Sequence, residues 1–222
     1  MNIIILAAGD FPTHEVPLRA LGNADLVVCC DSAYRVWEVE SGKRKMNKPF
    51  VVIGDGDSLS EVDKKALGDR WIEVDEQDYN DLHKAMQYVM DREWGAESEE
   101  RRITILGATG KREDHTLGNI SYLVTFAEEF LGADIEILTD YGRFVAMRGS
   151  RTFMSFPRQQ VSIFSMDSNQ PIYSEGLRWH LNGLQAQRWW QATLNEALAS
   201  EFSLRSEGWL VVFQTYEEKE VR

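Results

Sequence analysis

The sequence predicts an α/β fold, a mostly parallel sheet flanked by helices, followed by a smaller all-β domain with a sandwich architecture. Three observations support this. Short β-branched runs alternate with helix-like segments over the first ~140 residues. Five of the six runs are followed within two residues by Asp. Beyond about residue 143, alternating strand-like runs are separated by turn signals such as Asn182-Gly183. We therefore expect an α/β domain over residues 1–143 and a β domain over residues 144–222.

The carboxyl ends of the expected strands carry polar residues. Strands are predicted at 3–8, 25–30, 50–53, 71–74, 103–106 and 135–138. The fifth strand ends at Gly107, and each of the others ends at an Asp. Ligands of open parallel sheets bind at the carboxyl ends of the strands. The sequence therefore predicts a binding site at this edge.

Two amphipathic helices are predicted between these strands. Apolar residues recur with helical spacing at Leu82, Ala85, Met86 and Val89, and again from Leu117 to Ala127. The charge-rich run 91–102 is expected to be a solvated loop. For 185–199, a helix and a long loop with a short helix are comparably consistent with the sequence.

The overall charge and the cysteines limit the class of protein. The net charge is −12, which disfavours a nucleic-acid partner because such binding needs a basic surface. Cys29 and Cys30 are adjacent and cannot provide a disulfide framework, which fits a reducing compartment. The apolar run 3–8 is too short for a membrane span and has no basic leader. We expect a cytoplasmic protein without a membrane partner.

The turn Gly54-Asp55-Gly56-Asp57-Ser58 has two interpretations. Its carboxylates suit a divalent metal, since Mg²⁺ is held by one or two carboxylates together with substrate phosphates. It also fits a solvated turn in which Asp57 or Ser58 caps a helix. An EF-hand is excluded, because Leu59 and Ser60 stand where that loop needs Asp or Asn and then Gly.

The segment from Asp78 to Lys84 is the second candidate. Asp78, Asp81 and Lys84 are spaced to share one face of a helix that starts near Asn80. They suit a metal ligand beside a phosphate-binding lysine, or only a helix cap with an ion pair. His83 faces another way and is expected to be an ordinary surface histidine.

The glycine-rich loop from Gly107 to His115 is the third candidate. Backbone N–H groups between a strand and a helix suit a phosphate, and Arg112 can bind phosphate oxygens bidentately. The loop is not a Walker A motif, since Ile105 and Arg112 occupy required positions. His115 fits either a ligand contact or a helix cap. The run Leu6-Ala7-Ala8-Gly9 resembles the opening of sugar nucleotidyltransferases. In those enzymes a further glycine and a basic residue follow, and this chain has neither at that point.

Taken in order, these motifs resemble the thiamine pyrophosphokinase (thiamine diphosphokinase) family over nearly the whole chain. The matching segments are 30–33, 54–58, 78–85, 110–119 and 176–181, with a partial match of the family's Ser-Asn at Leu194-Asn195. Gly56 replaces Phe, Asn80 replaces Thr, Lys111 replaces Gly, Ser32-Ala33 replaces Gly-Gly and Leu194 replaces Ser. No carboxylate, lysine or arginine that the chemistry requires is lost.

The resemblance implies transfer of a pyrophosphoryl group from ATP to thiamine, giving thiamine diphosphate and AMP. It also implies a homodimer in which the β domain of one subunit completes the site of the other. Such a transfer needs positioning and charge neutralisation. Because thiamine is cationic and aromatic, a tryptophan face suits it.

Site residues are assigned on this basis. The Mg²⁺ ligands are expected to be Asp55, Asp57 and Asp81, and the catalytic residues Asp57, Asp81, Lys84 and Arg112. The ATP contacts are expected to be Asp31, Asp78, Lys84, Gly107, Thr109, Gly110, Arg112, Asp114 and His115, where Asp114 orients Arg112 or the loop. The thiamine contacts are expected to be Asp57, Trp179, Asn195 and Trp209. A nucleotide- or thiamine-binding regulatory protein of the same fold, and a nucleotidyltransferase, are the alternatives.

Overall fold

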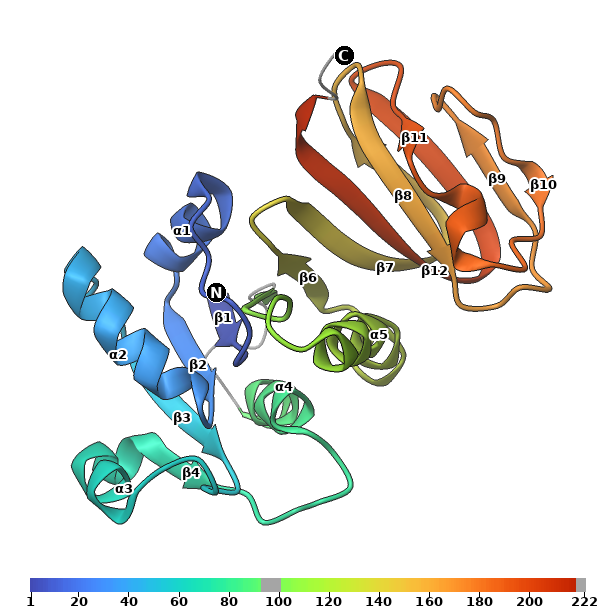
Figure 1. The fold of residues 1–222 in the computed structure, drawn as a ribbon. Coiled ribbons are helices and arrows are strands. Elements are labelled where there is room, and N and C mark those ends of the chain that lie inside the picture. Colours follow the sequence, from blue (N-terminus) through green and yellow to red (C-terminus); the bar gives the residue numbers. More distant parts are fainter. Residues whose placement is uncertain (93–100, 219–222) are drawn as a thin grey trace. The chain divides into compact units, whose positions relative to one another are not determined.

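The computed structural model describes residues 1–92 and 101–218 (Figure 1). The chain forms two compact units. The first contains residues 1–122 and 129–140, and the second contains residues 123–128 and the chain from Tyr141 on. The predicted boundary at 143/144 lies a few residues beyond this division. Of the run 91–102, predicted to be a loop, residues 93–100 lie outside the described part of the chain.

The first unit contains a parallel sheet with the strand order β6-β5-β1-β2-β3-β4. Its strands are β1 (Asn2–Leu6), β2 (Leu26–Cys30), β3 (Phe50–Gly54), β4 (Trp71–Glu73), β5 (Arg102–Leu106) and β6 (Asp134–Leu138). All six predicted strands are confirmed, with ends that shift by one or two residues. Every residue of β2 is buried. Continuous apolar runs of this kind are typical of a parallel sheet covered on both faces.

Helices cover both faces of this sheet. They are α1 (Glu15–Gly22), α2 (Ala33–Arg44), α3 (Glu61–Leu67), α4 (Asp81–Asp91) and α5 (Glu113–Glu129), with a short 3₁₀ helix η1 (Gly68–Arg70). Leu21, Trp37 and Leu67, from α1, α2 and α3, share one core cluster with alternate residues of the strands. The helix α4 lies against β1, β2 and β3. The predicted stripe of α4 is confirmed, since Leu82, Ala85, Met86 and Val89 are all buried.

The second unit is β-rich. Its strands are β7 (Gly142–Met154), β8 (Gln159–Ser165), β9 (Ile172–Glu175), β10 (Asn182–Leu184), β11 (Asn195–Glu196) and β12 (Glu201–Glu218). The long strand β12 pairs with β7 on one edge, with an irregularity between Ser206 and Leu210. On its other edge β9 pairs with the first part of β12 and β8 with the last part. Side chains such as Phe153, Val161, Phe202 and Leu210 form the core of this unit.

The segment 185–199 follows the loop alternative. It holds only the 3₁₀ helix η2 (Trp189–Ala192) and the two-residue strand β11. Asn182-Gly183, a turn signal in the sequence, lies in the strand β10, where Gly183 has a φ of 78°. Among the helices of the described residues, none is long and apolar enough to cross a membrane.

Candidate active site

A buried lysine lies between two carboxylates at the carboxyl edge of the first sheet. Lys84 of α4 has a side chain that is only 4% exposed. Its Nζ atom lies 3.5 Å from Oδ1 of Asp81 and 3.9 Å from Oδ2 of Asp55. A buried charge must be paired to be tolerated. Two of the predicted metal ligands and the predicted phosphate-binding lysine therefore form one charge cluster, which we call the carboxylate site.

The two carboxylates of this site differ in their environments. Burial raises the pKa of Asp81, and the neighbouring charges of Asp55 and Asp31 add to that, while Lys84 opposes it. The pKa of Asp55 is lowered, first by the backbone N–H of Asp57, which donates to Oδ1 at 3.2 Å. Local hydrogen bonds thus lower the pKa of Asp55, whereas burial raises that of Asp81 in spite of the nearby Lys84.

Asp31 adds a third carboxylate. It follows β2, is 3% exposed, and accepts a hydrogen bond from the backbone N–H of Ser58 at 3.1 Å. Its Oδ1 atom is buried without a hydrogen-bond partner among the described residues. A Cβ atom on Gly54 would lie 2.7 Å from Cβ of Asp31 and 3.4 Å from Cγ of Asp81. The glycine therefore allows both carboxylates to converge on the end of β3.

These donors fit a cation that is shared with a substrate. Within residues 1–92 and 101–218, no three His, Cys, Asp or Glu side chains are grouped so that they could hold a metal ion by themselves. Mg²⁺ needs less from the protein, since it usually takes one or two carboxylates and completes its shell with water and phosphate oxygens. The unpartnered Oδ1 atom of Asp31 and the carboxylates of Asp55 and Asp81 suit such a shared site.

Asp57 and Asp78 are exposed. The backbone N–H of Asp78 donates to the carboxylate of Glu76. The side chains of Asp57 and Asp78 form no hydrogen bond or ion pair with other residues that the structure describes. They are therefore free to meet a ligand, but the protein does not hold them in place.

Two departures from the family pattern have a structural reason. Gly56 has a φ of 81°, and a Cβ atom there would lie 2.5 Å from Nζ of Lys64 and 3.0 Å from Cζ2 of Trp71. The positive φ is the stronger reason for glycine at this position, because the Lys64 ammonium, 5.7 Å from the centre of the Trp71 ring, is the end of a flexible side chain that can move. Asn80 is the N-cap of α4 and accepts a hydrogen bond from the backbone N–H of His83 at 3.1 Å. Asn and Thr both serve as N-caps, so the cap is retained.

His83 is not a surface residue, so that prediction is wrong. The residue is 5% exposed, and its ring stacks on Tyr79 with 4.0 Å between the ring centres. Nε2 lies 2.9 Å from Oε2 of Glu129 in α5. The helical spacing of α4 does not reveal this burial, because Tyr79 and Glu129 lie outside that helix.

The loops that follow β1 and β5 are joined along their backbones. Gly9 N–H donates to the carbonyl of Gly107 at 2.7 Å, and Asp10 N–H to that of Thr109 at 2.9 Å. A Cβ atom on Gly9 would lie 2.2 Å from the Thr109 oxygen, so only glycine permits this approach. Gly107 and Gly110 have φ values of 64° and 82°. The predicted phosphate loop thus has the backbone that its glycines suggest.

Lys111 connects the same two loops through its side chain. Its Nζ donates to the backbone carbonyl of Ala8 at 2.7 Å. Its φ is 55°, in the left-handed region that favours glycine, the residue of the family pattern at this position.

At the start of α5, Arg112 Nε and Nη2 donate to the two carboxylate oxygens of Asp114 at 3.1 and 2.6 Å. This hydrogen bonding raises the pKa of Arg112 and lowers that of Asp114. Both side chains are largely exposed, and so is His115. Asn119 donates to the carbonyl of Ala108 at 2.9 Å. Asp114 therefore orients Arg112, while Asn119 supports the loop.

The predicted thiamine contacts lie in the second unit. Trp179 is 51% exposed. Asn195 is buried, accepts from the backbone N–H of Trp179 at 3.1 Å and donates to its carbonyl at 2.7 Å. Asn195 thus holds Trp179 in position. Trp209 is partly buried, and its Nε1 has no partner among the described residues. Leu194 is 66% exposed with a φ of 57°.

Several contacts at this edge are not apparent in the sequence. Cys30 Sγ donates to the backbone carbonyl of Asp81 at 3.5 Å, and Gln77 Nε2 to Oδ2 of Asp55 at 3.4 Å. Asp140, at the end of β6, accepts from the backbone N–H groups of Thr13 and His14 at 2.8 and 3.0 Å. Only the Asp at the strand end signals the last of these.

Comparison with known proteins identifies the family of the chain. Two family models match the chain: "Thiamin pyrophosphokinase, catalytic domain" over residues 18–135 and "Thiamin pyrophosphokinase, substrate-binding domain" over residues 142–213. The chain is 39% identical over 88 residues to thiamine pyrophosphokinase 1 of Oryza sativa subsp. japonica, an alignment that covers 38% of this chain and 33% of the rice protein. It is 36% identical over 122 residues to thiamine pyrophosphokinase 3 of the same plant, covering 49% and 46% of the two chains.

Solved structures share the fold. The thiamin pyrophosphokinase of Candida albicans superposes with a TM-score of 0.79 at 15% identity, over 97% of this chain and 90% of that one. That of Geobacillus thermodenitrificans superposes with a TM-score of 0.73 at 24% identity, over 98% of both chains. Because the two family models together span most of the sequence, with the carboxylate site inside the catalytic match, this chain belongs to the thiamin pyrophosphokinase family.

Proposed function

We propose that this protein is a thiamine diphosphokinase that transfers the pyrophosphoryl group of ATP to thiamine. The observation that carries the proposal is the buried Lys84 between Asp55 and Asp81, in a chain whose family forms thiamine diphosphate from ATP and thiamine. In the reaction, the hydroxyethyl oxygen of thiamine bonds to the β-phosphorus of ATP. The bond from that phosphorus to the α–β bridging oxygen breaks, and AMP leaves with the bridging oxygen.

The cationic side chains neutralise charge during this transfer. Lys84 is proposed to bind the phosphates from its buried position, and Arg112, oriented by Asp114, to stabilise the charge that develops on AMP. Because ion pairs already orient Lys84 and Arg112 before ATP binds, these two side chains lose little conformational entropy on binding. Asp31, Asp78, Thr109 and His115 are proposed as further ATP contacts, together with the backbone of Gly107 and Gly110.

Asp55, Asp57 and Asp81 are proposed to hold Mg²⁺ together with the phosphates. When bound, the cation would neutralise the phosphate oxygens and align the two substrates. Asp57 is the first choice for accepting the hydroxyl proton of thiamine, because its carboxylate forms no bond with other described residues, and Asp81 is the second.

Thiamine is proposed to stack on Trp179, with Trp209 as the second aromatic contact. The exposure of about half of Trp179 supports this, and so does Asn195, which fixes the Trp179 backbone. Arg178, whose Cζ atom lies 5.5 Å from the centre of the Trp179 ring, indicates that the ring accepts a cation. We further propose a cytoplasmic homodimer in which the second unit of one subunit completes the site of its partner.

One assay separates this activity from the alternatives. The full chain is incubated with ATP, Mg²⁺ and thiamine, and the products are separated. AMP and thiamine diphosphate are expected. Pyrophosphate as the product would identify a nucleotidyltransferase, and binding without turnover would identify a regulatory protein.

Two variants test the assigned roles. Asp57→Asn is expected to nearly abolish AMP formation, and near-normal turnover would contradict its role at the metal. Trp179→Ala is expected to raise the KM for thiamine far more than the KM for ATP. Equal effects on both KM values would argue against stacking.

A further inference from the structure

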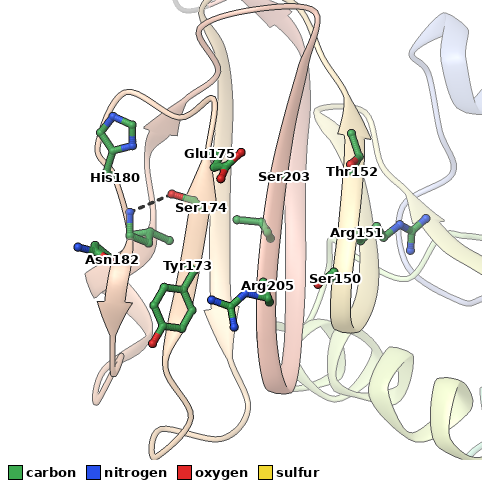
Figure 2. A pocket seen from close by; sticks show the side chains of 12 residues that line it. Ser150, Arg151, Thr152, Tyr173, Ser174, Glu175, His180, Asn182, Ser203 and Arg205 are labelled. Atoms are coloured by element: carbon green, nitrogen blue, oxygen red, sulfur yellow. Dashed lines mark hydrogen bonds between the residues drawn. The ribbon is translucent and has the colours of Figure 1, made fainter.

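A polar hollow of about 560 Å³ lies in the second unit on the sheet formed by β7, β12, β9 and β10 (Figure 2). The register places Ser203 of β12 between Thr152 of β7 and Glu175 of β9. Two residues further along β12, Arg205 lies between Ser150 and Tyr173. Short hydroxyl side chains and longer polar side chains therefore lie next to one another on this face of the sheet.

The opposite face of these strands is the core of the unit. Leu204, between Ser203 and Arg205, is 1% exposed, and so is Phe153 next to Thr152. Because successive side chains of a strand point to opposite faces, the polar set faces outward. The hollow thus opens on the face opposite the core, although the core residues Leu181 and Leu204 also border it, and it contains none of the residues assigned to ATP, Mg²⁺ or thiamine.

Arg205 is the distinctive residue of this hollow. Its Cζ atom lies 4.2 Å from the centre of the Tyr173 ring, and Figure 2 shows the guanidinium turned toward that ring. Within the described parts of the chain, Arg205 forms no ion pair or hydrogen bond through its side chain. Arg70, Arg148, Arg151 and Arg188 also have no carboxylate partner among the described residues, but each of them donates to a backbone carbonyl, which Arg205 does not. Stacking fixes its plane and leaves its N–H groups available.

Other polar groups around Arg205 are also without partners. The side chains of Ser150, Thr152, Ser203 and Asn182 form no hydrogen bond within residues 1–92 and 101–218. Hydroxyl, amide and guanidinium groups are the donors that bind phosphate oxygens. Several unpaired donors converging in one hollow are typical of a ligand site.

We propose that this hollow binds a small molecule through a phosphate group, held by Arg205 and the neighbouring hydroxyls. Glu175 indicates a second feature of the ligand. It is the diagonal neighbour of Arg205 across the strand pair, at about 7–8 Å between backbones, yet the two form no ion pair. A ligand with a cationic group beside its phosphate would match both charges. The site is independent of the proposed transferase activity.

The test is a titration of the full chain, followed by amide NMR shifts, with inorganic phosphate and with O-phosphoethanolamine. Both are expected to shift residues of β7, β9 and β12, and the ethanolamine ester to bind several-fold more tightly. Arg205→Gln is expected to weaken binding at this site at least tenfold, and Glu175→Gln to remove only the preference for the ester. Arg205→Lys keeps the charge, so its affinity for phosphate is expected to lie between those of the wild type and Arg205→Gln.

Arg151→Gln is the matched control. Arg151 also borders the hollow, but its Nη1 donates to the carbonyl of Ala146 at 3.4 Å, and its Cζ lies 5.2 Å from the Phe153 ring centre. This variant is expected to bind phosphate like the wild type. Comparing variants also removes any contribution of phosphate at the carboxylate site.

Two outcomes would overturn the proposal. One is the absence of phosphate-induced shifts in these strands, or shifts that are the same in Arg205→Gln. The other is an oligomeric state that changes in Arg205→Gln without any effect of phosphate, which would make this face a contact with a second copy of the chain.

Discussion

The ammonium group of Lys111 donates a hydrogen bond to the backbone carbonyl of Ala8 at 2.7 Å. This bond links the loop after β5 to the loop after β1, next to the backbone bonds of Gly9 and Asp10. It also gives a reason for a lysine at a position where the φ of 55° favours glycine. The hydrogen bond of the Lys111 side chain offsets the conformational cost of the positive φ, because it connects the two loops.

The first prediction concerns the hydrogen bond between Lys111 and Ala8. Lys111→Met removes the hydrogen bond and keeps the unfavourable φ, so the KM for ATP is expected to rise about fivefold, which corresponds to about 1 kcal/mol. Lys111→Gly should raise the KM for ATP similarly while losing less thermal stability than Lys111→Met, because glycine accepts a positive φ. Steady-state kinetics and thermal unfolding check this, and unchanged KM values in both variants would refute it.

The second prediction concerns Gly54. An added methyl would lie 2.7 Å from Cβ of Asp31, so Gly54→Ala should displace the carboxylates and reduce kcat/KM at least tenfold. Overpacking of this kind also costs about 1–3 kcal/mol of stability. Gly42→Ala in α2 is the control, since nothing lies within 4 Å of its added Cβ. The control should keep full activity; equal activity of the two variants would show that Gly54 does not shape the site.

The third prediction concerns the end of α2. Lys45 caps the helix in the left-handed conformation, with a φ of 53°, and its backbone N–H donates to the carbonyls of Ser41 and Gly42. Glycine adopts this conformation without strain, so Lys45→Gly should increase the free energy of unfolding by about 0.5–1 kcal/mol. Lys43→Gly, inside the helix, should decrease it by about 1 kcal/mol. Urea unfolding measures both, and a loss of stability in Lys45→Gly would contradict the prediction.

The fourth prediction concerns pH. The pKa of Asp63 is lowered, first by the hydroxyl of Ser60, which donates at 2.7 Å, and then by the Ser60 backbone N–H. A lowered folded-state pKa stabilises the fold above the unfolded pKa of about 3.9, and this contribution disappears as the pH falls through the folded value. Asp63→Asn should therefore unfold more easily than the wild type at pH 7, with a difference that shrinks below pH 4. A stability difference between Asp63→Asn and the wild type that does not change with pH would show that the ionised Asp63 carboxylate is not its cause.

Much of the first unit was predictable from the sequence, because parallel strands buried on both faces must be apolar and their ends must be polar. The six strands, the stripe of α4 and the gathering of Asp55, Asp81 and Lys84 follow from that pattern. The N-cap at Asn80 follows from local chemistry. The motifs in their order were enough to suggest the family.

Contacts between distant segments were decided only by the tertiary structure. The burial of His83 depends on Tyr79 and Glu129, and the glycine at position 9 depends on the backbone carbonyls of Gly107 and Thr109. The hollow around Arg205 depends on the register of three strands. Local patterns record which residues must be buried or capped, because these depend on near neighbours. They do not record which side chains from separate elements meet, because that depends on how the elements pack.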